Sequence, residues 1–185
     1  MSRIVIVDNH ETEVRIPLMR QLGRAFGSEE IQVAGNGAEA LSLLSSRNDP
    51  VGVIILDVMM PVMDGIAACR AIRANPNHDG VYIVMLTGRD GGLPEGLGVG
   101  ADVYLHKPCA IEELIAVVKK GLLESKKQYT LKQEHADLKK KWLQFEEELE
   151  RLRLAGVGVG MEDHFAMETR VSWVELVGDV GSGSR

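Results

Sequence analysis

Residues 53–65 read VIILDVMMPVMDG, an apolar run that ends at a carboxylate. The aliphatic residues 53–56 do not alternate with polar ones, which is typical of a strand covered on both faces. Asp57 follows this run directly, and a proline and an Asp-Gly pair then mark a turn. Ligands of open parallel sheets bind beyond the carboxyl ends of the strands. The stretch therefore predicts a buried strand that presents Asp57 at the binding edge of a sheet.

Apolar runs of strand length recur along the first two-thirds of the chain, with helical patterns between them. Strands are expected at residues 4–7, 31–34, 51–56, 81–86 and 103–105. A helical face is predicted after the first run, because Val14, Leu18 and Leu22 recur at helical spacing. This alternation predicts an α/β fold in which helices cover both faces of a parallel sheet.

The fourth connection between strands differs from the others in composition. Residues 88–103 read GRDGGLPEGLGVGADV, and its many glycines and its proline oppose helix formation. We expect a short or distorted fourth helix here, in a mobile segment.

A long helix is expected to begin near Ile111 and to continue past the end of a compact domain. From residue 131 its seam positions follow a heptad spacing of four and three, namely Leu131, His135, Leu138, Trp142, Phe145, Leu149 and Leu152. Oppositely charged residues flank this seam, which favours a parallel two-stranded coiled coil. An amphipathic helix that folds back on its own domain is the alternative, because about three heptads is near the minimum for this signal.

These patterns divide the chain into three parts. We expect a folded domain over residues 1–123, a coiled-coil helix over 124–155 that extends the fifth helix of the domain, and a Gly/Val-rich tail over 156–185. The tail includes a candidate strand at 171–177, and no motif in it indicates a function.

Composition and charge exclude several classes of protein. Of 185 residues 45% are hydrophobic, which argues against disorder. The formal net charge of -6 argues against broad nucleic-acid affinity. No window holds the roughly 18 consecutive apolar residues of a membrane span, and residues 1–10 read as a strand rather than a signal peptide. The two cysteines make no disulfide framework, so a reduced, cytoplasmic location is expected.

The predicted strand ends carry a coherent set of polar side chains. Asp8 and Asn9 follow the first strand, Asp57 the third, Thr87 the fourth, and Lys107 comes just after the fifth. Carboxylates with open coordination positions suit Mg²⁺, which keeps several waters and binds phosphate. A hydroxyl and an ammonium suit phosphate oxygens. We therefore expect a phosphate- and Mg²⁺-binding edge with Asp57 as its nucleophile.

Five motifs resemble the receiver domain of two-component response regulators, over residues 2 to about 123. They are IVIVDN at 4–9, NGAEAL at 36–41, ILDVMMPVMDG at 55–65, MLTGRD at 85–90 and GADVYLHKP at 100–108. The resemblance implies a flavodoxin-like, doubly wound five-stranded parallel sheet with strand order 2-1-3-4-5. It implies that Asp57 accepts a phosphoryl group from a histidine kinase or a phosphotransfer protein, with no enzyme activity beyond self-phosphorylation and self-dephosphorylation.

The resemblance also implies roles for the other strand-end residues. Mg²⁺ would lie between Asp57, the acids of the first strand and the backbone carbonyl of Met59. Thr87 and Lys107 would hold phosphate oxygens, and Tyr104 would act with Thr87 as the switch.

The sequence departs from the family pattern in the metal site. The family has two adjacent acids after the first strand, whereas here the second is Asn9, which costs one negative charge. Glu11 is a possible substitute ligand, because the segment before Arg15 is one residue longer than the common pattern. We expect weaker Mg²⁺ binding than in a two-acid site.

The leading interpretation is a response regulator in which phosphorylation of Asp57 switches a dimeric coiled-coil output. No basic helix-turn-helix follows the receiver, so direct DNA binding is not expected. One alternative is a degenerate receiver that serves as a phosphate-independent scaffold. Another is that these residues are the N-terminal part of a longer receiver-output protein.

Overall fold

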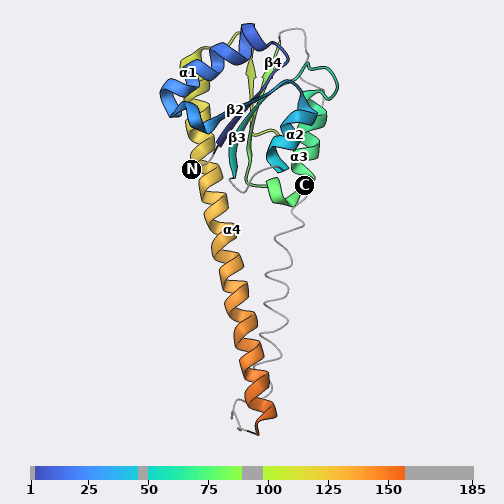
Figure 1. The fold of residues 1–185 in the computed structure, drawn as a ribbon, viewed down its shortest axis with the longest axis vertical. Helices are drawn as coiled ribbons and strands as arrows, with labels where there is room; N and C mark the ends of the chain where they lie inside the picture. Colours follow the sequence, from blue (N-terminus) through green and yellow to red (C-terminus); the bar gives the residue numbers. More distant parts are fainter. Residues whose placement is uncertain (1–2, 46–49, 89–97, 157–185) are drawn as a thin grey trace. The chain divides into compact units, whose positions relative to one another are not determined.

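The computed structural model describes residues 3–45, 50–88 and 98–156 (Figure 1). Its strands are β1 (Arg3–Val7), β2 (Ile31–Ala34), β3 (Val51–Asp57), β4 (Tyr82–Thr87) and β5 (Val103–His106). Its α-helices are α1 (Ile16–Phe26), α2 (Gly37–Ser45), α3 (Gly65–Arg73) and α4 (Ile111–Leu154). A π-helical turn precedes α1 at Glu11–Arg15, and short 3₁₀ turns lie at Ser28–Glu30 and Pro76–His78. Each of the five expected strands is present, and no strand end differs from its expected position by more than one residue.

The five strands form one parallel sheet in the order β2-β1-β3-β4-β5, which confirms the predicted fold class. Every residue of β3 is buried, as its unbroken aliphatic run predicted. All strands run in the same direction, so their carboxyl ends lie at a single edge of the sheet (Figure 1). This edge receives the polar residues that follow each strand.

Two apolar layers enclose the sheet. On one face the core includes Leu22 of α1 with Leu114 and Val118 of α4. On the other face it includes Leu44 of α2 and Ile72 of α3. Alternate residues of each strand point into opposite layers, so the central strands need apolar residues at every position.

Helix α4 packs very closely on the sheet at Gly121. A side chain on Gly121 would place its Cβ 2.8 Å from Tyr82 Cγ and 2.9 Å from Val53 Cγ2. Glycine in a helix interior costs stability relative to alanine. Here it allows the backbone of α4 to lie directly against β3 and β4.

The chain divides into two compact units, residues 1–134 and 135–185. Within the first unit, contacts continue past residue 123: Lys132 Nζ lies 3.1 Å from the carbonyl oxygen of Pro76 and 3.0 Å from Asp79 Oδ2. Of the second unit, the structure describes 135–156, most of it helix α4. The expected fourth helix and the candidate strand at 171–177 fall largely or wholly outside the described residues.

Among the described residues, no helix has both the length and the apolar character that a membrane span needs. Cys69 and Cys109 are both free thiols. Cys69 lies on the buried face of α3 in the core, and burial raises the pKa of its thiol.

Candidate phosphoacceptor and metal site

Three strands bring the charged residues of the site together. Asp8 directly follows β1, Asp57 is the last residue of β3, and Lys107 directly follows β5. The backbone N–H of Asp8 donates to Ala34 O at 3.2 Å, and that of Lys107 donates to Thr87 O at 2.7 Å. These bonds extend the strand pairing by one residue, so the backbone under both side chains is fixed by the sheet.

Lys107 joins the two buried carboxylates. Its Nζ lies 2.8 Å from Asp8 Oδ2 and 3.1 Å from Asp57 Oδ1. Asp8 is 2% exposed and Asp57 is 5% exposed, so both carboxylates depend on such partners for solvation. The convergence that the sequence predicted from separate strand ends is therefore present.

The environment of Lys107 keeps its ammonium charged. Burial acts to lower its pKa, but the hydrogen bonds and the charges of Asp8 and Asp57 outweigh this effect, and the net pKa is raised. The lysine therefore carries its positive charge throughout the neutral range. With two carboxylates and one ammonium, these three residues leave one negative charge at the sheet edge.

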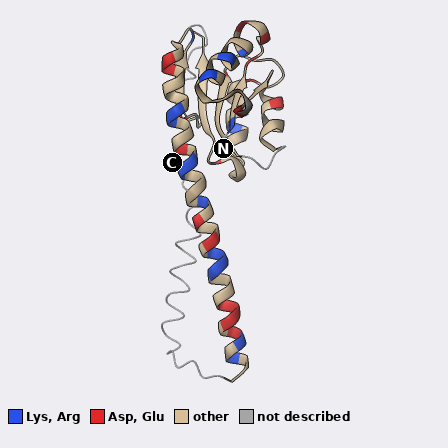
Figure 2. Ribbon diagram, turned by 60° about the vertical axis from the view of Figure 1, so that its left-hand side comes forward, with Lys and Arg blue, Asp and Glu red and all other residues tan. Residues whose placement is uncertain are grey.

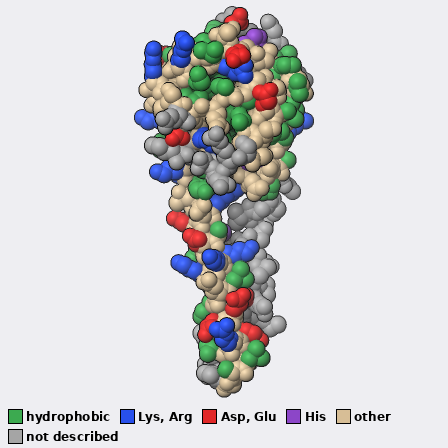
Figure 3. All heavy atoms as spheres, viewed as in Figure 1, with side chains coloured by type: hydrophobic (Ala, Val, Ile, Leu, Met, Phe, Trp, Pro, Cys, Tyr) green, Lys and Arg blue, Asp and Glu red, His purple; other side chains and the backbone are tan. Residues whose placement is uncertain are grey.

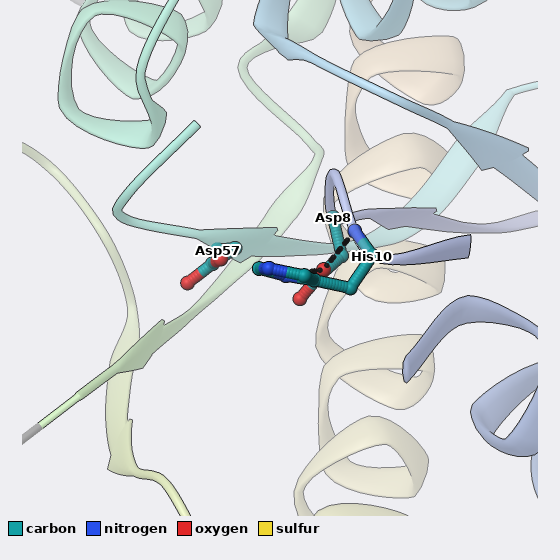
Figure 4. A group of neighbouring side chains, drawn as sticks. All are labelled: Asp8, His10 and Asp57. Carbon is teal, nitrogen blue, oxygen red and sulfur yellow. Dashed lines mark hydrogen bonds and ion pairs between the residues drawn. The ribbon is translucent and has the colours of Figure 1, made fainter. Parts of the chain in front are cut away.

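His10 lies beside Asp8 and Asp57 and completes a group of three side chains that could hold a metal ion (Figure 4). Ligand atoms of Asp8, His10 and Asp57 all lie within 4.8 Å of one another. The backbone N–H of His10 donates to Asp8 Oδ1 at 2.8 Å, and its ring Nδ1 lies 3.1 Å from the same oxygen. The ring reaches from Asp8 towards Asp57 (Figure 4). Two carboxylates and an imidazole are a donor set that fits a divalent cation.

Sequence reasoning missed His10. The strand-end argument considered only residues that lie at or next to a strand end, and the family comparison weighed Asn9 and Glu11. The available signal was the spacing of two residues between Asp8 and His10, which allows an imidazole to return to the carboxylate in a short turn. Histidine is also the commonest metal ligand.

The other residues assigned to the metal site take less central positions. Asn9 is exposed, and the side chain of Met59 is 69% exposed. The carboxylate of Glu11 pairs with Arg15 at 3.4 Å instead of joining Asp8 and Asp57. Their roles as metal ligands stay predictions.

Thr87 has a partner that the sequence did not predict. Thr87 and His106 are direct neighbours in the pairing of β4 with β5, and Thr87 Oγ1 lies 3.0 Å from His106 Nδ1. Thr87 is 1% exposed, whereas His106 is exposed. The hydroxyl is therefore engaged with β5, and its role in holding phosphate stays a prediction.

Tyr104 lies in β5 with its ring partly buried against the apolar layer that also holds α2 and α3. Burial raises the pKa of its phenol, with a smaller contribution from Cys69. It lies two residues before His106, the partner of Thr87. This position is compatible with the predicted switch.

The loop after Asp57 is held tightly at its far end. Asp64 is the N-cap of α3, and its side chain accepts a 2.7 Å hydrogen bond from the Ala67 N–H. Gly65 N donates to Val58 O at 3.0 Å, and the glycine leaves no room for a side chain against Asp57. The backbone that carries Asp57 is thus braced by the start of the next helix.

A five-stranded parallel sheet that brings two buried carboxylates and a lysine together at one edge is the arrangement expected of a receiver domain. A family model described as "Response regulator receiver domain" matches residues 4–119. The chain belongs to this family.

Relatives and solved structures agree with that assignment. Response regulator MprA of Mycolicibacterium vanbaalenii is 42% identical over 116 residues, which is 62% of this chain and 47% of the relative. MprA of Mycobacterium avium is 40% identical over 126 residues, 67% of this chain and 52% of the relative. The chain therefore spans about half the length of the curated relatives it matches.

Solved structures cover a similar share of the chain. The receiver domain of a signal transduction histidine kinase from Syntrophus aciditrophicus is 31% identical, with a TM-score of 0.59 over 66% of this chain and 90% of that one. Chemotaxis protein CheY4 of Vibrio cholerae is also 31% identical, with a TM-score of 0.57 over 66% of this chain and 99% of that one.

Proposed function

We propose that the protein is a phosphorylation-controlled response regulator in which Asp57 is the phosphoacceptor. The donor is a histidine kinase or a phosphotransfer protein, and the reaction depends on Mg²⁺. The observation that carries the proposal is the contact of one ammonium, on Lys107, with the buried carboxylates of both Asp8 and Asp57. This arrangement supplies a fixed nucleophile and a fixed positive charge at one point.

The chemistry assigns a role to each side chain. An oxygen of Asp57 forms a bond to phosphorus while the bond from phosphorus to the donor nitrogen breaks, and the donor nitrogen then takes up a proton. Phosphoryl transfer depends mainly on positioning and on neutralising charge on the transferred oxygens. Lys107 supplies part of that neutralisation, and Mg²⁺ bound beside Asp8 and Asp57 would supply the rest. The sheet holds the nucleophile in line.

The switch follows from the added charge. A phosphoryl group adds about two negative charges and three acceptor oxygens. These oxygens compete with His106 for the hydroxyl of Thr87, and a shift of Thr87 away from β5 would open space for Tyr104. The local charge change would thereby be coupled to the packing position of Tyr104.

A phosphodonor experiment tests this function. The full chain, incubated with a small acyl phosphate and Mg²⁺, should gain about 80 Da in intact mass, the mass of one phosphoryl group. The same mixture with EDTA should give little or no adduct, because metal neutralisation is then missing. An unmodified mass under both conditions would favour the alternative of a phosphate-independent scaffold.

We propose that α4 provides the output as a parallel coiled-coil dimer over the predicted 124–155 segment. Three large seam residues are strongly exposed in the chain: Leu131 at 58%, Leu138 at 55% and Phe145 at 54%. Positions of both charge signs follow one another along the helix (Figure 2), and apolar and charged groups mix over its surface (Figure 3). A second copy of the same helix is the partner that matches this seam.

The flanking charges support the parallel orientation. In a parallel dimer, each g residue faces the e residue of the next heptad. The resulting attractive pairs are Glu134–Lys139, Lys141–Glu146 and Glu148–Arg153. In the single chain Glu148 instead lies 3.5 Å from Arg151 of its own helix, an exposed pair that is easily exchanged.

Charge in the seam should break the dimer. The double variant Leu138→Glu/Phe145→Glu places four carboxylates in the interface of two helices, and we expect it to sediment as a monomer at concentrations where the wild type is dimeric. Leu143→Glu is the matched control, because Leu143 is 50% exposed but lies outside the seam. A monomeric wild type, or equal effects of both changes, would remove the dimer proposal.

Restoring the missing acid should tighten Mg²⁺ binding. Asn9→Asp adds a negative charge next to Asp8, and each unit charge at close range is worth about 1 kcal/mol or more. We expect at least a severalfold lower dissociation constant for Mg²⁺ by calorimetric titration. An unchanged constant would indicate that residue 9 does not face the metal.

The relatives extend well beyond the matched region. In this chain we assign the output to the segment after the receiver. The alternative, that the chain is the N-terminal part of a longer receiver-output protein, stays open beside the coiled-coil proposal. The absence of direct DNA binding stays a prediction.

A further inference from the structure

His10 gives the metal site a feature that its carboxylates do not explain. Its ring lies between Asp8 and Asp57 (Figure 4), and its side chain is 52% exposed while that of Asp8 is 2% exposed. The cluster is thus open to solvent on the side of the imidazole. An ion that enters from this side meets the ring and both carboxylates.

The contact with Asp8 prepares the ring for coordination. When Nδ1 carries the proton, it donates to Asp8 Oδ1 across 3.1 Å, and the lone pair of the ring then lies on Nε2. In metal-binding histidines, the N–H of the second ring nitrogen usually donates a hydrogen bond to a group such as a carboxylate. This bond fixes the tautomer and raises the basicity of the nitrogen that binds the metal. The backbone bond from His10 N–H to the same oxygen fixes the turn that carries the ring.

The ligand type decides which cation benefits. Mg²⁺ is a hard cation that takes oxygen ligands and keeps its waters. Imidazole nitrogen suits borderline transition metals, and affinity at such sites rises from Mn²⁺ to Co²⁺. Asn9, which precedes His10, is neutral. A carboxylate at this position would add a negative charge that favours every dication equally, and this site lacks that charge.

We propose that His10 is a nitrogen ligand of the metal site and makes it selective for transition-metal dications such as Mn²⁺ and Co²⁺ over Mg²⁺. This inference rests on the proposed function, since it concerns the metal of the same site. The protein would then be phosphorylated more readily with Mn²⁺ than with an equal concentration of Mg²⁺.

His10→Asn separates coordination from structure. An asparagine amide nitrogen occupies about the position of Nδ1, so the variant keeps a donor for Asp8 Oδ1 and loses the outer ring nitrogen. His78→Asn is the matched control, because His78 lies in the turn that precedes β4 and therefore at the amino-terminal edge of the sheet. Both variants are made in the full chain.

Metal titration of the three proteins tests the inference. We expect His10→Asn to weaken Co²⁺ binding by at least about tenfold, in the range seen for changes around metal ligands, and to leave Mg²⁺ binding nearly unchanged. Pulsed electron paramagnetic resonance of the Mn²⁺-loaded wild type should show nitrogen coupling that the variant lacks. His78→Asn should match the wild type in each measurement.

Two results would overturn the inference. One is equal Co²⁺ affinity in wild type and His10→Asn, and the other is the absence of nitrogen coupling in the Mn²⁺-loaded wild type. Failure of the proposed function has a different signature. If the protein takes up no phosphoryl group with any metal, the proposed function is wrong. If His10→Asn still lowers the Co²⁺ affinity of that protein, the inference that His10 is a metal ligand holds.

Discussion

Asp57→Asn should abolish the phosphoryl adduct completely. The carboxylate that forms the new bond becomes an amide, which is not a nucleophile under these conditions, while the size and shape of the side chain are retained. The change also removes one of the two carboxylates that contact Lys107. The ion pair between Lys107 and Asp8, at 2.8 Å, then holds the lysine in place. Intact mass after incubation with phosphodonor and Mg²⁺ measures the loss.

Asp64→Asn is the matched control for this change. Asp64 lies in the same loop and accepts a hydrogen bond from Ala67 N–H at the start of α3, a role that asparagine fills equally well. The control should be phosphorylated as the wild type is. Persistent modification of Asp57→Asn would show that another residue accepts the phosphoryl group.

Gly65→Ala should damage both the fold and the site. A Cβ at this position would overlap the backbone oxygen of Asp57 and lie 3.0 Å from its carbonyl carbon and 3.1 Å from Val58 Cα. These are backbone atoms, so no side-chain rotation relieves the clash. We expect the free energy of unfolding to fall by about 3 kcal/mol or more, measured by urea denaturation followed by circular dichroism.

Gly88→Ala is the control, because Gly88 follows β4 at the same edge of the sheet and a Cβ there would meet nothing within 4 Å. Its effect on stability should stay within about 0.5 kcal/mol. Surviving folded Gly65→Ala protein should also be phosphorylated slowly, because small displacements of a reacting group are costly. Equal stability of the two variants would contradict the tight bracing of Asp57.

The sequence predicted the sheet well because buried parallel strands leave a strong pattern. β3 has no polar side chain before Asp57, and its neighbours β1 and β4 are largely apolar, with Arg3 at the start of β1 and Thr87 at the end of β4. The α/β fold class and the shared edge at which the strands end then follow from the alternation of strands and helices. The close approach of Gly121 to Tyr82 was not predicted, since it depends on the relative position of two elements that are distant in the chain.

In the site, prediction succeeded where the strand direction alone fixes a residue. Asp8, Asp57 and Lys107 meet because three parallel strands end together. His10 and the partner of Thr87 were missed because they depend on the turn after β1 and on the register of β4 with β5. The direction of a side chain at a strand end depends on its neighbours in space, and a single sequence does not show which residues those are.

Helix α4 begins at Ile111, as the sequence predicted, and continues to Leu154. Its continuity supports the heptad pattern, which requires one uninterrupted helix. Dimer formation stays a prediction, because the pattern of exposed seam residues describes one chain. The sedimentation comparison of seam and control variants decides it.

Chemical mapping of the modified residue tests the central claim most directly. A mutation at Asp57 also changes the candidate metal site, whereas borohydride reduction of the phosphorylated wild type marks only a carboxylate that carries a phosphoryl group. Peptide sequencing by mass spectrometry should place the reduced residue at position 57 alone. A reduced residue at position 8, or a phosphoryl group on the imidazole of His10, would contradict the account.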